Sequence, residues 1–252
     1  MYKKIAFLGC GKIGQKMLNY LNTRDDCSVS YIQDPFLDPE KLPGVKVVTE
    51  ADAALLAETD LVIECATASV LKANAEQILK NADLLMFSVT AYQDAEFQAN
   101  VEKWCQESGH HVYLPHGAIL GIDGIYDSRP LLKRVVIETE KSPQSLGRED
   151  TERTVVYEGP TREACALYPR NVNVHASIAL AGIGFDKTVS KIISDPAVDT
   201  NSHHIYVEGD GVRFELQITS LANGSITGAY TPVSAVGSLR RLLGDPSPFR
   251  FI

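Results

Sequence analysis

The 252-residue sequence has few cysteines, one tryptophan, no basic run and no long hydrophobic segment. Its five cysteines are scattered and form no CxxC pair, which excludes a disulfide framework and a cysteine-based zinc site and predicts reduced thiols without a metal. The net charge of −8 argues against a nucleic-acid surface. The longest apolar segment, 176–185, is too short to cross a bilayer. The first residues enter a strand without a signal-peptide pattern, so we expect a cytoplasmic protein without membrane partners.

The first part of the sequence alternates short apolar runs with amphipathic stretches. Strands are expected at 5–8, 27–32, 45–48, 61–65, 84–89 and 111–114, and helices at 51–56, 69–79 and 94–107. Strands that are apolar throughout and separated by helices indicate a parallel sheet covered on both faces. The predicted fold class is therefore α/β, with a doubly wound, Rossmann-type nucleotide-binding domain.

The pattern changes after Pro115. Strands are expected at 135–140, 153–157, 204–208 and 212–219, and helices at 168–183 and 232–243. The polar segment 142–151 is expected to be a loop. This part predicts an α+β domain with a mainly antiparallel sheet. We predict a dinucleotide-binding domain at 1–117, with 229–252 packing back on it, and a substrate, catalytic and dimerisation domain at 118–228.

The most informative motif is the glycine loop, residues 9–14, between the first apolar run and a segment of helical spacing. Gly9 would permit a tight turn, Gly11 a close approach to a pyrophosphate, and Gly14 close packing of helix on strand. The N–H groups and positive dipole end of the helix would hold phosphates. The motif predicts a dinucleotide site rather than a bare structural turn, with the binding residues Gly9, Gly11, Lys12, Ile13 and Gly14.

Asp34 ends the second predicted strand, 20 residues after Gly14. A carboxylate there can accept hydrogen bonds from the adenosine ribose hydroxyls and would repel a 2′-phosphate. We therefore expect the cofactor to be NAD, with NADP as the alternative. A purely structural interpretation also stays open, in which Asp34 caps a turn before Pro35.

Several motifs are specific in combination. Beyond the glycine loop they are Ser88-Val89, Gly117-Ala118-x-x-Gly121-Ile122-Asp123, Lys141-Ser-Pro143, Asn171-Val-Asn173-Val and Asp195-Pro196…Asn201-x-His203. With these motifs the sequence resembles the L-aspartate dehydrogenases over nearly its whole length. The resemblance implies NAD(P)-linked oxidative deamination of L-aspartate through iminosuccinate, with oxaloacetate and ammonia as hydrolysis products. It also implies a homodimer.

The resemblance assigns roles to individual residues. His203 matches the catalytic histidine of the family, and Ala118 and Asn173 match positions near the nicotinamide half of the cofactor. A histidine can accept a proton from the substrate ammonium or activate water against the imine. Asn201 would share the face of His203 if this segment is a strand, and could orient the substrate or the imidazole.

The other histidines are alternatives for the proton-transfer role. His204 would point to the opposite strand face from His203. His116 and His175 stand where the family usually has small or apolar residues, and their roles stay open.

The two carboxylates of the substrate require cationic or N–H partners. Arg170, Lys187 and the backbone of 182–184 are near the relevant motifs in the sequence, and Lys187 is the predicted side chain.

Residues 223–232 depart from the family pattern, which usually has Asn-Pro-Lys/Arg-Thr late in the chain. This segment lacks the basic residue. The departure leaves open a related dehydrogenase or imine reductase for another small amino acid or oxoacid. A non-catalytic NAD-binding protein is a further alternative, although a pure sensor would not need the proton-transfer group that Asn201-x-His203 supplies.

Overall fold

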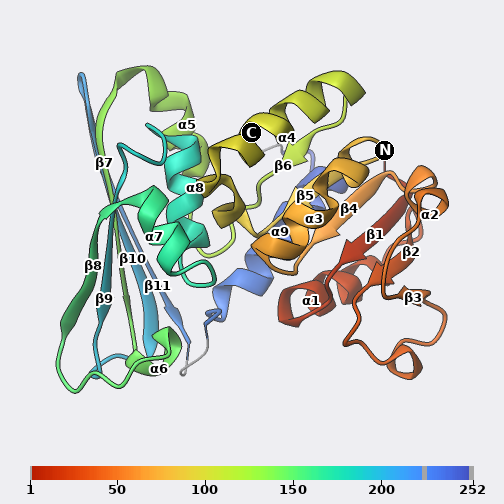
Figure 1. Ribbon diagram of the computed structural model, residues 1–252, viewed down its shortest axis with the longest axis horizontal. Coiled ribbons are helices and arrows are strands. Elements are labelled where there is room, and N and C mark those ends of the chain that lie inside the picture. Colours follow the sequence, from red (N-terminus) through yellow and green to blue (C-terminus); the bar gives the residue numbers. More distant parts are fainter. Residues whose placement is uncertain (1, 223–225, 250–252) are drawn as a thin grey trace. The chain divides into compact units, whose positions relative to one another are not determined.

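The structure is a computed structural model that describes residues 2–222 and 226–249 (Figure 1). It divides into two compact units. The first comprises Met1–Ser88, Ala95–Pro115 and Pro232–Ile252, and the second comprises Val89–Asp94 and His116–Thr231. None of the helices in the described ranges has the length and apolar character that a membrane span requires.

The segment 89–94 differs from the prediction, which placed it in the first domain. Its residue Thr90 donates from its backbone N–H to Asn173 Oδ1 (3.1 Å) and from its hydroxyl to the Pro169 carbonyl (3.0 Å). These long-range bonds place the segment in the second unit, and nothing local in the sequence indicates them.

In the first unit, strands and helices alternate. The elements are β1 (Lys4–Leu8), α1 (Lys12–Leu21), β2 (Ser28–Gln33), η1 (Pro39–Lys41), β3 (Val47–Val48), α2 (Ala53–Ala57), β4 (Leu61–Glu64), α3 (Ala68–Leu79), β5 (Asp83–Met86), α4 (Ala95–Ser108), β6 (Val112–Tyr113) and most of α9 (Tyr230–Leu243). They form a six-stranded parallel sheet in the order β3-β2-β1-β4-β5-β6. This is the Rossmann strand order, so the predicted fold class is confirmed.

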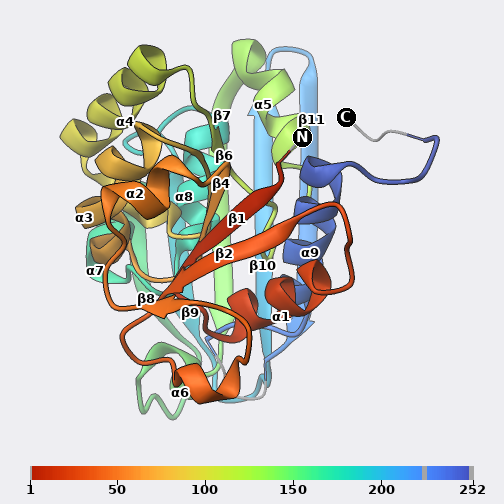
Figure 2. The ribbon, with the colours of Figure 1, turned by 90° about the vertical axis from the view of Figure 1, so that its right-hand side faces the viewer.

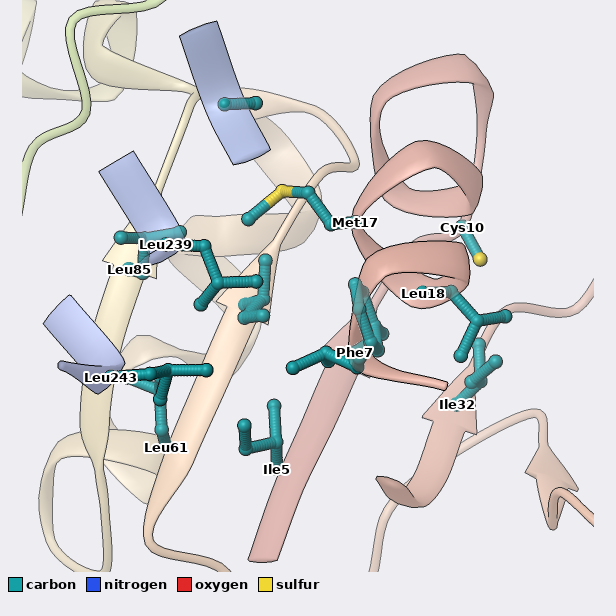
Figure 3. Packing of buried hydrophobic residues seen from close by; sticks show 13 residues of the cluster. Ile5, Phe7, Cys10, Met17, Leu18, Ile32, Leu61, Leu85, Leu239 and Leu243 are labelled. Atoms are coloured by element: carbon teal, nitrogen blue, oxygen red, sulfur yellow. The ribbon is translucent and has the colours of Figure 1, made fainter. Parts of the chain in front are cut away.

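An apolar cluster anchors the glycine loop from both sides. Ile5 in β1 is fully buried, and Met17 and Leu18 in α1 lie on the helix face that packs against the sheet. Leu239 and Leu243 of α9 belong to the same cluster (Figure 3). The ribbon of α9 runs beside α1 (Figure 2). Burying one such side chain contributes about 1.5–3 kcal/mol. The two elements that flank the glycine loop are therefore held firmly.

The second unit is built on one mixed sheet. Its elements are η2 (Val89–Gln93), α5 (Ile122–Ser128), η3 (Arg129–Leu131), β7 (Leu132–Lys141), α6 (Pro143–Leu146), β8 (Thr154–Pro160), α7 (Thr161–Leu167), α8 (Asn173–Ala181), β9 (Val189–Ser194), β10 (Thr200–Gly209) and β11 (Val212–Leu221). The strand order is β11-β10-β7-β9-β8, and only the β7–β9 pair is parallel in this sheet of the described chain. The mainly antiparallel prediction is confirmed. Helices α5, α7 and α8 lie on one face of the sheet (Figure 1).

The predicted helix at 168–183 is wrong at its start, because α8 begins only at Asn173. Pro169 cannot donate a helix hydrogen bond, and the residue before it, Tyr168, is the C-cap of the preceding helix α7. Helix α7 and strand β9 were not predicted, since both are short and neither has a strong periodic pattern.

The predicted loop at 142–151 contains a one-turn helix, α6. Its N-cap Ser142 accepts a hydrogen bond from the Ser145 backbone N–H, and Pro143 occupies the first turn. Serine followed by proline is a helix-start signal. The prediction overlooked it because the segment is polar.

Candidate active site

The glycine loop has the form that a dinucleotide site requires. Gly9 has φ = 81°, and a Cβ there would lie 2.8 Å from the Ala66 Cβ, so only glycine fits. A Cβ on Gly11 would meet no atom within 4 Å, which leaves open space beside the backbone at this residue. The predicted residues Lys12, Ile13 and Gly14 form the first turn of α1. The structure therefore brings the five predicted loop residues together.

The N-terminus of α1 is not capped by a side chain. Its N-cap residue is Gly11, and no side-chain hydrogen bond is made there. The first N–H groups of a helix have no partner within the helix, and the helix dipole adds positive potential at that end. These groups fit the phosphates of a dinucleotide.

Asp34 lies against the glycine loop. One carboxylate oxygen accepts from the Cys10 backbone N–H (2.9 Å), and the other accepts from the Phe36 N–H (3.0 Å). The bond from Phe36 is the turn-capping contact that the structural interpretation of Asp34 predicts. The bond from Cys10 attaches the carboxylate to the glycine loop. Each oxygen has a further lone pair, so Asp34 keeps capacity to accept from ribose hydroxyls.

The second unit contains a buried group of polar side chains, called here the polar cluster. Its members are Thr139 and Lys141 of β7, His175 of α8, and Asn201 and His203 of β10. In the antiparallel β7–β10 pair, Asn201 is opposite Lys141 and His203 is opposite Thr139. All five residues are at most 4% exposed. The prediction that Asn201 and His203 share a strand face is confirmed.

The His203 imidazole is held at one nitrogen. Its Nδ1 lies 2.8 Å from Thr139 Oγ1, and no described residue forms a hydrogen bond to Nε2. Burial, and then the charge of Lys141, lower the pKa of His203 to about 3. The ring is therefore neutral at physiological pH. His204 lies on the other strand face, where it contacts Tyr206 and Glu215.

Lys141 is a member of the polar cluster that the sequence analysis did not single out as a candidate site residue. It is 3% exposed, and the described residues offer its Nζ only the Ile226 carbonyl, at 3.4 Å. Burial lowers the pKa of Lys141 to about 8, which leaves the ammonium form predominant at neutral pH. The alternation of the β7 sequence could have placed residues 139 and 141 on one face.

Asn201, the cross-strand partner of Lys141, has an unused acceptor within the described chain. Its Nδ2 donates to the Ile226 carbonyl (3.0 Å), whereas its buried Oδ1 has no partner among the described residues. Buried polar groups are normally hydrogen-bonded, so this oxygen has the capacity to accept from a further donor. Part of the departing segment, 223–225, lies outside the described residues.

The predicted substrate residue Lys187 is not part of the polar cluster. It is exposed, in the turn before β9. Ser194, at the far end of β9, pairs with Lys141, and Val189 begins the strand five residues earlier. Lys187 is therefore separated from Lys141 by the length of the strand, roughly 17 Å. Nearness in sequence does not bring Lys187 to the polar cluster, because β9 runs away from this turn.

The two predicted nicotinamide-side residues both lie in the second unit. Ala118 is partly exposed in the turn that follows β6. Asn173 is the first residue of α8, and its Oδ1 accepts from the Thr90 N–H. The amide nitrogen of Asn173 keeps its donors for another partner.

Comparison with known proteins identifies both units. The family model "Homoserine dehydrogenase, NAD binding domain" matches residues 9–115, and "Aspartate dehydrogenase, C-terminal" matches residues 126–242. The first unit is therefore a domain of the NAD-binding type.

Relatives match over almost the full length. The L-aspartate dehydrogenase of Nitrosopumilus maritimus is 31% identical, over 96% of this chain and 97% of its own. That of Thermotoga maritima is 32% identical, over 94% and 96%. A crystal structure of the Thermotoga maritima aspartate dehydrogenase superimposes with a TM-score of 0.81 at 30% identity, covering 100% of both chains. The chain therefore belongs to the L-aspartate dehydrogenase family of oxidoreductases.

Proposed function

We propose that this chain catalyses the NAD-linked interconversion of L-aspartate with oxaloacetate and ammonia through iminosuccinate, with His203 as the proton-transfer group. The polar cluster is the observation that supports this most. It combines a neutral imidazole with an unoccupied Nε2, a buried ammonium group and an amide oxygen without a partner in the described chain. These three groups suit an amino acid with a second carboxylate.

Lys141 would bind a substrate carboxylate. Burying a charge without a counter-charge is costly, and a bound carboxylate would remove this cost for Lys141. Asn201 Oδ1 would accept a hydrogen bond from the substrate amine or imine. A carboxylate held by Lys141 would leave the α-carbon of an amino acid near His203, and the family to which the chain belongs supports aspartate as that amino acid.

His203 would remove the proton that blocks oxidation. Hydride leaves the α-carbon only when the amine is neutral and its lone pair can form the C=N bond. Nε2 of His203 takes a proton from the α-ammonium group and holds it as imidazolium. A carboxylate beside Lys141 offsets the lysine charge, which raises the pKa of His203 and makes this transfer easier. Once Nε2 has released that proton to solvent, His203 accepts a proton from the water that adds to the imine and passes it to the leaving amine, which departs as ammonia.

The nicotinamide ring supplies the hydride-accepting chemistry when the cofactor is bound. The residues that would hold the cofactor fit it: Gly11 leaves space for the pyrophosphate, and the uncapped end of α1 offers N–H donors. Asp34 would accept hydrogen bonds from the adenosine ribose. Its negative charge supports NAD as the preferred cofactor over NADP.

The test is the loss of NADH absorbance with oxaloacetate, in the presence and absence of ammonium, repeated with NADPH. Oxidation that requires ammonium, with aspartate as the product, is the expected result. Oxidation without ammonium would instead identify an oxoacid reductase. Tight NADH binding with no turnover of oxaloacetate and ammonium would contradict the proposed substrate.

A homodimer, a cytoplasmic location and the absence of nucleic-acid partners also stay predictions. The homodimer rests on the family resemblance, and light scattering coupled to size-exclusion chromatography tests it. A monomer mass of 27.5 kDa in solution would contradict it.

A further inference from the structure

A chain of hydrogen bonds leads from His203 into the interior of the second unit. Its contacts are His203 Nδ1–Thr139 Oγ1 (2.8 Å), Thr139 Oγ1–His175 Nε2 (2.6 Å), His175 Nδ1–Ser190 Oγ (2.8 Å), Ser190 Oγ–Thr161 Oγ1 (2.8 Å) and Thr161 Oγ1–Thr188 carbonyl O (3.0 Å). The five side chains come from β10, β7, α8, β9 and α7 and are at most 2% exposed. This series of hydrogen bonds therefore runs between side chains of the sheet and of the helices that cover it, out of contact with solvent.

The Thr188 carbonyl, the last acceptor of this hydrogen-bond chain, determines which group donates in each bond. A carbonyl only accepts, so the Thr161 hydroxyl donates to it and must accept from Ser190. The Ser190 hydroxyl has then used its only hydrogen. It must accept from Nδ1–H of His175.

The same rule continues to His203. Because neutral His175 carries its hydrogen on Nδ1, its Nε2 is an acceptor, and the Thr139 hydroxyl donates to it. Thr139 can then only accept from His203, which must carry its hydrogen on Nδ1. Five hydrogens serve five bonds, and with both rings neutral no other arrangement satisfies all of them.

We propose that His175 is a positioning residue that acts through Thr139 to hold His203 in its Nδ1–H tautomer, which reserves Nε2 for proton transfer with the substrate. Its catalytic consequence rests on the proposed function, whereas the tautomer itself does not. An Nδ1–H ring offers the Nε2 lone pair to the substrate ammonium group. An Nε2–H ring would present a hydrogen there and could not accept the proton.

The proposal requires His175 to be neutral. A doubly protonated His175 would donate to Thr139, which could then donate only to His203 Nδ1 and would force the hydrogen of His203 onto Nε2. Complete burial, followed by electrostatic interaction with His203 and Lys141, lowers the pKa of His175 well below its usual value. The surroundings of His175 thus favour the state that the direction of the chain needs.

The direct test is ¹⁵N NMR of the unliganded protein with ¹⁵N-labelled histidine. The His203 signals are assigned by their loss in His203→Gln. We expect a protonated-type shift at Nδ1 and an unprotonated-type shift at Nε2. The opposite pattern, or an even mixture of tautomers, would overturn the proposal. This measurement needs neither substrate nor turnover, so it is independent of the proposed function.

Ser190→Ala tests the remote control of the tautomer without altering either imidazole. It removes the acceptor of His175 Nδ1–H, so the direction of the chain is no longer determined. We expect the His203 signals to shift toward a mixture of tautomers. Ser177→Ala is the matched control, because Ser177 is a buried residue of α8 whose hydroxyl bonds to the Asn173 carbonyl and not to this chain. Unchanged His203 signals in Ser190→Ala would contradict the role of the chain.

A kinetic pair tests the consequence for the reaction. His175→Leu removes both ring nitrogens, and we expect kcat to fall about 10-fold or more with KM nearly unchanged, because a wrong tautomer impairs only the proton transfer. In His175→Gln the side-chain oxygen can accept from Thr139 while the amide N–H donates to Ser190, so most of kcat should return. Equal losses in both variants, or a loss confined to KM, would overturn the positioning role.

Discussion

Particular buried polar groups of the two units differ in how completely they are hydrogen-bonded. In the first unit the buried carboxylate of Glu64 lies at the carboxyl end of β4, where the N–H groups of Ala66, Phe87 and Ser88 and the Ser88 hydroxyl all donate to it. In the second unit Lys141 has one long hydrogen bond among the described residues, and Asn201 Oδ1 has none. The first arrangement is complete, and the second leaves binding capacity unused.

This difference distinguishes buried polar groups that stabilise the fold from buried polar groups that can bind a ligand. A saturated group such as Glu64 connects the loops that follow β4 and β5, and it gains nothing from a ligand. Unsaturated groups such as Lys141 and Asn201 remain costly until a ligand satisfies them. The largest effects on turnover should therefore come from the polar cluster, and the largest effects on folding from groups like Glu64.

Replacing His203 should break the chemistry of the polar cluster most severely. His203→Ala should lower kcat by about 10²-fold or more, because it removes the group that transfers the proton. The affinity for NADH should stay within a few-fold, since the glycine loop is untouched. Steady-state kinetics and fluorescence titration with NADH measure the two quantities.

The neighbour of this histidine supplies the control. His204→Ala removes a ring of the same kind from the opposite face of β10, where it contacts Tyr206 and Glu215. It should leave kcat nearly unchanged. Similar losses in both variants would mean that the strand, and not the His203 ring, determines activity.

Replacing Lys141 should weaken substrate binding by a smaller factor. Lys141→Met keeps an apolar stem of similar length but loses the charge, so KM for oxaloacetate should rise roughly 10- to 100-fold. Lys191→Met is the control, because Lys191 is also a lysine of this sheet but pairs with Glu138 at 3.0 Å. If KM changes equally in both variants, Lys141 does not bind the substrate carboxylate.

The first unit was predictable because its signals are local. The glycine loop and its flanking strand and helix are consecutive in the sequence, and each glycine has a reason that can be stated from the motif alone. Asp34 follows from a fixed spacing in the same fold. Even the bond from Cys10 to Asp34 only joins two neighbouring turns.

The polar cluster was only half predictable because it depends on strand register. Asn201 and His203 are two residues apart, so a period of two places them on one face. Lys141 reaches them only through the pairing of β7 with β10, and His175 only through the packing of α8 on that sheet. No local pattern encodes these contacts, so the sequence analysis named Lys187 and did not single out Lys141.

Glu64→Gln tests the saturated side of the comparison. The amide would place an NH₂ group against N–H or O–H donors, so the first unit should lose about 1–3 kcal/mol of stability. The only tryptophan, Trp104, lies in α4 of this unit, and its fluorescence during urea unfolding reports the change. Glu58→Gln is the control, since Glu58 is exposed and pairs with Lys4. A stable Glu64→Gln protein would show that saturation is not what makes Glu64 structural.

Asp34→Ser should relax cofactor choice in the first unit. A serine hydroxyl can still accept from the Cys10 N–H, but the negative charge that opposes a 2′-phosphate is gone. The ratio of kcat/KM for NADPH over NADH should rise by about 10-fold, or ~1.4 kcal/mol. Asp38→Ser, in the next turn, should leave the ratio unchanged. An unchanged ratio in Asp34→Ser would assign the residue to turn capping alone.

The smallest expected effect is a pH dependence of ligand binding. It tests directly whether the Lys141 ammonium group binds a carboxylate. Succinate is a dicarboxylate without an amine, so its own charge is constant above neutral pH. Because burial lowers the pKa of Lys141 to about 8, the ammonium form is present below that pH and is lost above it. The Kd for succinate should therefore rise roughly fivefold between pH 8 and pH 9. In Lys141→Arg the guanidinium stays charged over this range, so its Kd should be flat. A Kd that rises equally in both proteins would assign the titration to another group. Lys141 would then not be the residue that binds the carboxylate.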